Sequence, residues 1–186
     1  CMYSSWSPSI IHRDLKSPNV FVDEHWHCKV GDFGLARFDT PAEASTMHKL
    51  RGSYAYAAPE TYRSTEKFTT KSDVYSFSII LWELCKRTQQ KSYTSPFAEI
   101  SADFQIIIQT AEKNLRPKIE KTFPKPLVDL MQLCWHPDPS KRPSFNTISK
   151  IISKMIGHVG KPTIPPKILT TLSSSTSSTS TSSSKT

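Results

Sequence analysis

The sequence has few cysteines, few glycines and no long hydrophobic run. Its four cysteines lie far apart and form no CxxC pair, which argues against a disulfide scaffold and favours a reducing compartment. The longest apolar run, around Ile79 to Leu84, is interrupted by Glu83 and is too short to span a bilayer. The N-terminus has no basic stretch followed by an apolar one, so no secretory signal is expected. We therefore expect a cytoplasmic protein without a membrane span.

The five glycines form no GxGxxG pattern, so the chain carries no glycine-rich loop of the kind that covers phosphates. The formal charge is +8, but the lysines and arginines are scattered along the chain. Scattered charge favours a solvated basic surface, and no nucleic-acid partner is expected. The cluster His25-Trp26-His27-Cys28 is an alternative zinc site, although it lacks a second ligand pair at a standard spacing.

The composition predicts one globular domain followed by a tail. Hydrophobic residues make up 37% of the chain, which favours a folded domain, here placed over residues 1–159. Residues 160–186 contain several prolines and then almost only Ser and Thr. Such a segment cannot bury enough apolar surface to offset its conformational entropy, so we expect it to be disordered. A phosphoacceptor role for this tail and a purely flexible tail both stay open.

The predicted elements are short strands first and helices after. Strands are expected at residues 9–11, 20–22 and 27–30. A helix starting at Ser72 is expected to be buried, because its sequence is apolar on nearly every face. Helical spacing also predicts helices over residues 98–111, 126–135 and 144–156, with Ser144 as the cap of the last.

Four polar residues lie in two loops that follow apolar strands. Asp14, Lys16 and Asn19 occupy one loop, and Asp32 follows the next strand. A carboxylate with an amide oxygen suits magnesium, which prefers oxygen ligands. A carboxylate beside a lysine suits a general base next to a phosphoryl acceptor. For Asp14 taken alone, a solvated Asx-turn is the alternative.

Three linked motifs carry a resemblance to a known family. HRDLKSPN at 12–19, DFG at 32–34 and APE at 58–60 resemble the protein kinase catalytic domain, in the same order. The resemblance runs from about Ile10 to Ile156. It implies an α+β protein-kinase-like fold, of which this chain holds the mainly α-helical C-terminal lobe with a few short strands, the N-terminal lobe being absent.

The resemblance implies ATP and Mg²⁺ as cofactors and assigns roles at the site. Asp14 would orient the acceptor hydroxyl and take its proton, while Lys16 would steady the transferred phosphate. Asn19 and Asp32 would hold the magnesium ions. Phe21 would form the floor under adenine.

The resemblance also implies regulatory and substrate-binding residues. Arg13 precedes the base, a pattern in which the arginine binds a phosphate on the activation segment. Ser45 or Thr46 is the expected phosphorylated residue. The Ser53 hydroxyl would bond to Asp14 and Lys16. Ala57 departs from the methionine that is common at its position in the family.

Further matching residues would support the scaffold. His12 and Phe33 would belong to a stacked spine of side chains between the lobes. Glu60 and Arg142 would form a buried ion pair, and Asp73 would accept amide hydrogens from the catalytic loop. Without the resemblance, a helix cap for Asp73 and a surface charge for Arg142 would be preferred.

The details favour serine and threonine as acceptors. Lys16 and Ser53 are typical of Ser/Thr kinases, whereas DVYSFSIILWEL and LCWHPDPSKRPSF resemble tyrosine kinases. This mixture resembles the tyrosine-kinase-like group, such as the Raf and mixed-lineage families, with dual specificity as the alternative. The expected partners are protein substrates with Ser/Thr acceptors, and an upstream activating kinase or a second copy acting in trans.

The chain has no VAIK-like lysine and no room before Ile10 for a complete nucleotide-binding lobe. We therefore expect a fragment of a Ser/Thr kinase that transfers no phosphate by itself. The alternative is a non-catalytic docking or scaffold module.

Overall fold

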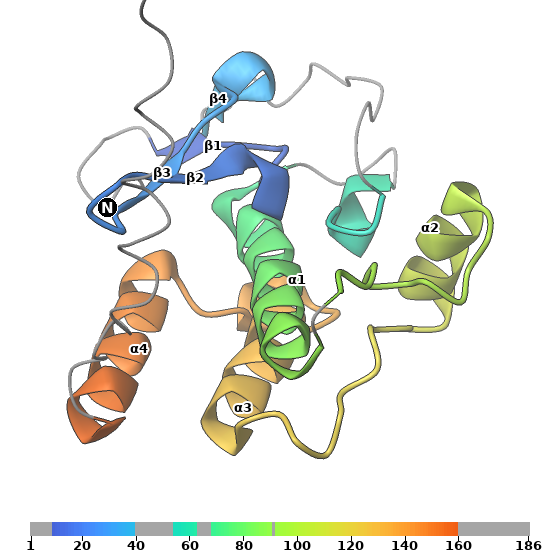
Figure 1. The fold of residues 1–186 in the computed structure, drawn as a ribbon. Coiled ribbons are helices and arrows are strands. Elements are labelled where there is room, and N and C mark those ends of the chain that lie inside the picture. The colour runs from blue at the N-terminus through green and yellow to red at the C-terminus, as the bar shows by residue number, and fades with distance from the viewer. Residues whose placement is uncertain (1–8, 40–53, 63–67, 91, 160–186) are drawn as a thin grey trace, which may run out of the picture. The chain divides into compact units, whose positions relative to one another are not determined.

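The computed structural model describes residues 9–39, 54–62, 68–90 and 92–159 (Figure 1). The chain divides into two compact units, one ending at Ile151 and the other beginning at Ile152. All features of the candidate site lie in the first unit. The predicted tail lies outside the described residues, so the boundary at residue 160 stays a prediction.

The described strands form two separate antiparallel pairs. Strand β1 (Ile10–Ile11) pairs with β4 (Arg37–Phe38), and β2 (Val20–Val22) pairs with β3 (Cys28–Val30). The three predicted strands are therefore present, with β1 and β3 each one residue shorter than expected. Strand β4 was not predicted, because a two-residue strand gives no periodic signal.

Helix α1 (Thr70–Gln89) begins two residues earlier than predicted, because a capping box fixes its start. The Lys71 amide donates to the Thr69 hydroxyl oxygen, and the Thr69 amide donates to the Ser72 hydroxyl oxygen. These bonds satisfy amides that the first turn of a helix leaves without partners. Most of α1 is buried on all sides, as its apolar sequence predicts.

Helix α2 (Asp103–Glu112) starts five residues later than predicted. Residues 96–99 form a turn instead, in which the Ile100 amide donates to the Phe97 carbonyl. Phe97 is almost fully buried in this turn. The prediction therefore extended the helix over Ala98 and Glu99, which belong to this turn, and over residues 100–102, which precede α2.

The last two helices lie close to their predicted bounds. They are α3 (Lys125–Cys134) and α4 (Phe145–Val159). The Thr147 amide donates to the Ser144 hydroxyl at 3.2 Å, which confirms Ser144 as the cap of α4.

The core of the first unit forms where α1 contacts α3 and strand β1. Its most deeply buried apolar side chains come from these helices and the turns around them: Val74, Tyr75, Ile79, Phe97, Leu130, Met131 and Cys134. A mainly helical body with a few short strands is the predicted kind of fold. None of the helices in the described residues has the length and apolar character needed to cross a bilayer.

Candidate active site

The loop between β1 and β2 brings Asp14, Lys16 and Asn19 into one cluster. Lys16 Nζ donates to Asp14 Oδ2 at 2.7 Å. Asn19 Nδ2 donates to the backbone oxygen of Asp14 at 2.9 Å and to Oδ2 at 3.4 Å. The Lys16 and Asp14 side chains are only 18% and 15% exposed, so solvent screens their attraction less than on an open surface. The Asp14 carboxylate is thereby held between an ammonium and an amide group.

A short 3₁₀ turn, η1 (Ser17–Asn19), explains how the chain folds back to make this cluster. The Asn19 amide donates to the Lys16 carbonyl at 3.0 Å. Pro18 occupies the first turn, where a fixed φ fits and a missing N–H leaves no bond unmade. The turn therefore returns Asn19 toward Asp14, five positions earlier in the sequence.

The carboxylate of Asp73, on α1, anchors the start of the same loop. It accepts hydrogen bonds from the His12 amide at 2.7 Å and the Arg13 amide at 3.0 Å. Arg13 has a φ of 71°, which non-glycine residues rarely adopt. Bonds to a buried carboxylate are strong enough to hold such a backbone conformation. Asp73 is not the helix cap, since Thr69 fills that position.

Asp32 stands at the same end of the β2–β3 hairpin as Asn19. Val20 pairs with Val30, and the Gly31 amide donates to the Asn19 carbonyl at 2.9 Å. Asp32 follows directly with a left-handed φ of 60°, and its side chain is exposed. The hairpin register therefore places the two proposed magnesium ligands on neighbouring turns.

His12 and Phe33 are in contact, with ring centroids 4.9 Å apart. His12 is fully buried and its Nε2 lies 2.9 Å from the Gly31 carbonyl oxygen. Phe21 is largely exposed, and its ring packs against Gly31 so closely that a Cβ there would meet the ring at 2.7 Å. Glycine at this position is what permits the close approach of the ring.

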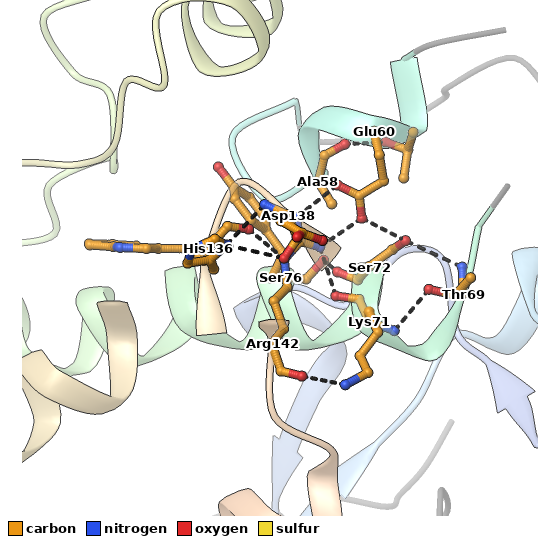
Figure 2. Close-up of polar contacts among 12 residues, drawn as sticks. Ala58, Glu60, Thr69, Lys71, Ser72, Ser76, His136, Asp138 and Arg142 are labelled. Atoms are coloured by element: carbon orange, nitrogen blue, oxygen red, sulfur yellow. Dashed lines mark hydrogen bonds and ion pairs between the residues drawn. The ribbon is translucent and has the colours of Figure 1, made fainter. Parts of the chain in front are cut away.

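Glu60 and Arg142 form a fully buried bidentate ion pair (Figure 2). The Arg142 nitrogens Nη1 and Nη2 donate to the two carboxylate oxygens at 2.6 and 2.8 Å. Arg142 also donates to the backbone oxygens of Lys71 and His136, and Ser72 donates to Glu60. Arg142 is therefore not a surface charge, and this network ties the segment before α1 to the segment before α4.

A second network joins the loop that contains Asp14 to α1, and the sequence did not predict it. Tyr56 OH lies 3.2 Å from Ser17 Oγ and donates to Glu83 Oε1 at 2.6 Å. Tyr93 OH donates to the same oxygen at 2.7 Å. Burial, followed by the bond to Glu83, raises the pKa of Tyr56 well above its usual range. The available signal was Glu83 itself, a charged residue inside an apolar helix.

The remaining predicted residues are only partly visible. Ser45, Thr46 and Ser53 lie outside the described residues. The Arg13 guanidinium lies over the ring of Phe68, 4.5 Å from its centroid. In the described ranges, no group of three or more His, Cys, Asp or Glu side chains is arranged to hold a metal ion, and this includes the stretch around His25.

Comparison with known proteins identifies the family. The model of the protein tyrosine and serine/threonine kinase family matches residues 6–152. The chain is 49% identical over 159 residues to stress-activated protein kinase alpha of Dictyostelium discoideum, covering 84% of the chain and 24% of that protein. It is 40% identical over 153 residues to a serine/threonine-protein kinase of Arabidopsis thaliana, covering 82% of the chain and 25% of that protein.

The chain therefore spans about a quarter of the length of these curated relatives. The matched region contains the whole Asp14 cluster, both anchoring networks and nearly all of the first compact unit. The chain belongs to the protein tyrosine and serine/threonine kinase family.

Proposed function

We propose that the chain is the C-terminal lobe of a serine/threonine protein kinase, which transfers the γ-phosphate of ATP to Ser/Thr hydroxyls of protein substrates. The observation that carries this proposal is the Asp14 carboxylate, held at 2.7 Å by Lys16 and braced by Asn19. A purely docking lobe has no chemical need for this arrangement.

In this proposal Asp14 orients the acceptor hydroxyl and takes its proton. Its orientation is fixed in advance, because the loop is anchored on Asp73 and closed by Asn19. Lys16 places a positive charge beside the reacting group, where negative charge accumulates during transfer. Such a preorganised charge needs little rearrangement during the reaction.

The donor set also fits a magnesium ion. Asn19 uses its amide nitrogen on Asp14, so its side-chain oxygen is the atom that can serve a cation. Asp32 adds an exposed carboxylate at the same end of the hairpin. Magnesium is commonly held by one or two such side chains together with substrate phosphates. Bound Mg²⁺-ATP supplies the transferred phosphoryl group, and Phe21 would lie under its adenine.

Two finer assignments belong to the same proposal. Lys16, together with Ser53, supports Ser/Thr acceptors, and the relative from Arabidopsis thaliana is a serine/threonine-protein kinase. The mixture of Ser/Thr-like and tyrosine-kinase-like motifs supports the tyrosine-kinase-like group, similar to the Raf and mixed-lineage families. We place the protein in the cytoplasm, in a signalling role.

Regulation is proposed to act through Arg13. Its guanidinium would bind a phosphate placed on Ser45 or Thr46 by an upstream kinase or by a second copy in trans. Phosphate binding there would bear directly on the loop, because the Arg13 amide is bonded to Asp73.

The test is phosphate transfer to a peptide by the full-length protein and its Asp14→Asn variant. The variant should lose at least about 100-fold in kcat, because a positioned base contributes about 10²–10⁴-fold, while nucleotide affinity is retained. Asp129→Asn is the matched control, since Asp129 also forms a 2.7 Å ion pair with a lysine, but an exposed one. A full-length protein without transfer activity would support the docking alternative. Equal activity of Asp14→Asn and the wild type would refute the role of Asp14.

A further inference from the structure

Glu83 is a charged residue in the buried interior of α1, and only 7% of its surface is exposed. Its Oε1 atom accepts two phenol hydrogens, one from Tyr56 and one from Tyr93. Its Oε2 atom is buried without a hydrogen-bond partner in the part of the chain that the structure describes. A buried carboxylate is costly unless it is well bonded, so Glu83 depends strongly on the two tyrosines.

The two tyrosines come from very different places. Tyr56 is buried in the segment just before the APE motif, and its hydroxyl reaches Ser17 in the catalytic loop. Tyr93 lies in the connection between α1 and α2, and its surface is 64% exposed. The largely exposed Tyr93 therefore donates to the same Glu83 oxygen as the buried Tyr56.

The protonation of both phenols fixes the direction of these bonds. Burial and the adjacent carboxylate raise the pKa values of Tyr56 and Tyr93, so both hydroxyls stay protonated and donate to Glu83 at neutral pH. With its hydrogen given to Glu83, Tyr56 OH is left to accept from Ser17. Charge-assisted bonds of this kind are stronger than neutral ones.

We propose that Tyr93 is a positioning residue for the catalytic loop, acting through the bond series Tyr93–Glu83–Tyr56–Ser17. Ser17 stands directly after Lys16 and begins the 3₁₀ turn that brings Asn19 to Asp14. Tyr93 donates one of the two hydrogen bonds that stabilise the Glu83 carboxylate, and this bond keeps the carboxylate oriented toward Tyr56. This inference rests on the proposed function, because it assigns Tyr93 to the same catalytic loop.

A connection to Tyr93 gives the α1–α2 segment influence over catalysis. Tyr93 is the most exposed member of the series, since Tyr56 and Glu83 are buried and Ser17 is half-buried. Whatever displaces the Tyr93 ring leaves Glu83 with one donor fewer. The catalytic loop then loses part of its support without any change in Asp14 or Lys16.

The test compares Tyr93→Phe with wild type in the full-length protein. Phenylalanine keeps the exposed ring and removes only the hydroxyl, so folding should be preserved. We expect kcat for peptide phosphorylation to fall about 3- to 10-fold, with the KM for ATP unchanged. This is less than the full worth of a bond to a charged group, because Tyr93 acts on the loop only through Glu83 and Tyr56. We also expect amide hydrogen exchange in peptides covering residues 12–20 to become faster.

Thr94→Val is the matched control. Its hydroxyl donates to the side-chain oxygen of Gln90, at the end of α1, and this exposed bond is not part of the Tyr93–Glu83–Tyr56–Ser17 series. This variant should change neither kcat nor exchange in residues 12–20. A further variant, Tyr93→Phe with Tyr56→Phe, should be less impaired than the product of the two single effects, because both act on Glu83.

The exchange measurement separates the two proposals. If the full-length protein shows no transfer activity but Tyr93→Phe still speeds exchange in residues 12–20, the proposed function fails and the coupling stands. If the wild type is active and Tyr93→Phe changes neither kcat nor exchange in that loop, the coupling is wrong. Faster exchange confined to residues 92–102 would show a local structural role and would also overturn the proposal.

Discussion

Arg142 and Glu60 stand 82 positions apart in the sequence and meet through two nearly equal hydrogen bonds, 2.6 and 2.8 Å long. Neither side chain is more than 5% exposed. The planar guanidinium matches the planar carboxylate, a geometry that lysine cannot reproduce. The pair therefore fixes both the distance and the relative orientation of the two segments that it joins.

Loss of one partner should destabilise the fold strongly. We expect Arg142→Ala to lower the free energy of unfolding by about 3–5 kcal/mol, since the Glu60 carboxylate is then buried without its counter-charge. Urea denaturation of the full-length protein measures this. Adding Glu60→Ala should recover part of the loss, because no unpaired carboxylate remains. A double variant as unstable as the sum of both single variants would show that the two residues act independently.

Asp73→Asn should loosen the catalytic loop while α1 stays intact. The amide side chain has only one oxygen, so it cannot accept from both the His12 and the Arg13 amides as the carboxylate does. We expect about 1.5–3 kcal/mol of lost stability, the usual range for a bond to a charged group, together with lower kcat. The control is Asp138→Asn, where an exposed carboxylate accepts the Ser140 amide. Equal effects of the two variants on kcat would contradict the assigned role of Asp73.

Stability should fall steeply above pH 10. Burial raises the pKa of Tyr62, whose hydroxyl donates to the Tyr54 carbonyl at 3.0 Å. Below pH 10, about the ordinary pKa of a phenol, Tyr62 is protonated in both the folded and the unfolded state, so its contribution is complete. Above that pH the unfolded state loses the proton first, and unfolding becomes easier by about 1.4 kcal/mol per pH unit for each such tyrosine.

Tyr62→Phe should therefore reduce the slope of unfolding free energy against pH between pH 10 and 11.5. The difference between the two proteins at pH 7 measures the lost hydrogen bond alone, and serves as the reference. The same slope in both proteins would show that Tyr62 ionises equally in the folded and unfolded states.

The regular elements could be predicted because they repeat. The apolar sequence of α1 and the stripe of α4 each extend over several turns, and their bounds were nearly right. Ala98 and Glu99 were predicted as the start of a helix, but they belong to a turn in which the Ile100 amide donates to the Phe97 carbonyl. Strand β4 is defined by its partner β1, and no pattern within two residues can reveal a pairing.

At the candidate site, too, the local contacts could be predicted and the contacts between distant segments could not. The Asp14 cluster is local, so spacing alone suggested it, and the structure brings Asp14, Lys16 and Asn19 together. The Glu60–Arg142 contact followed only from the family resemblance, because the sequence around either residue does not indicate its partner 82 positions away. The Tyr56–Glu83–Tyr93 network was missed altogether, since a hydrogen bond between distant segments depends on tertiary folding.

Helix α1 sets the distance between two residues, Asp73 and Glu83, that support the loops around it. Asp73 and Glu83 are ten residues apart on one helix, a separation of about 15 Å along the axis. One residue inserted between them would turn every later side chain by about 100°, and Asp73 and Glu83 could no longer serve the same loop. Relatives that keep this loop should therefore never change the spacing between Asp73 and Glu83 inside α1.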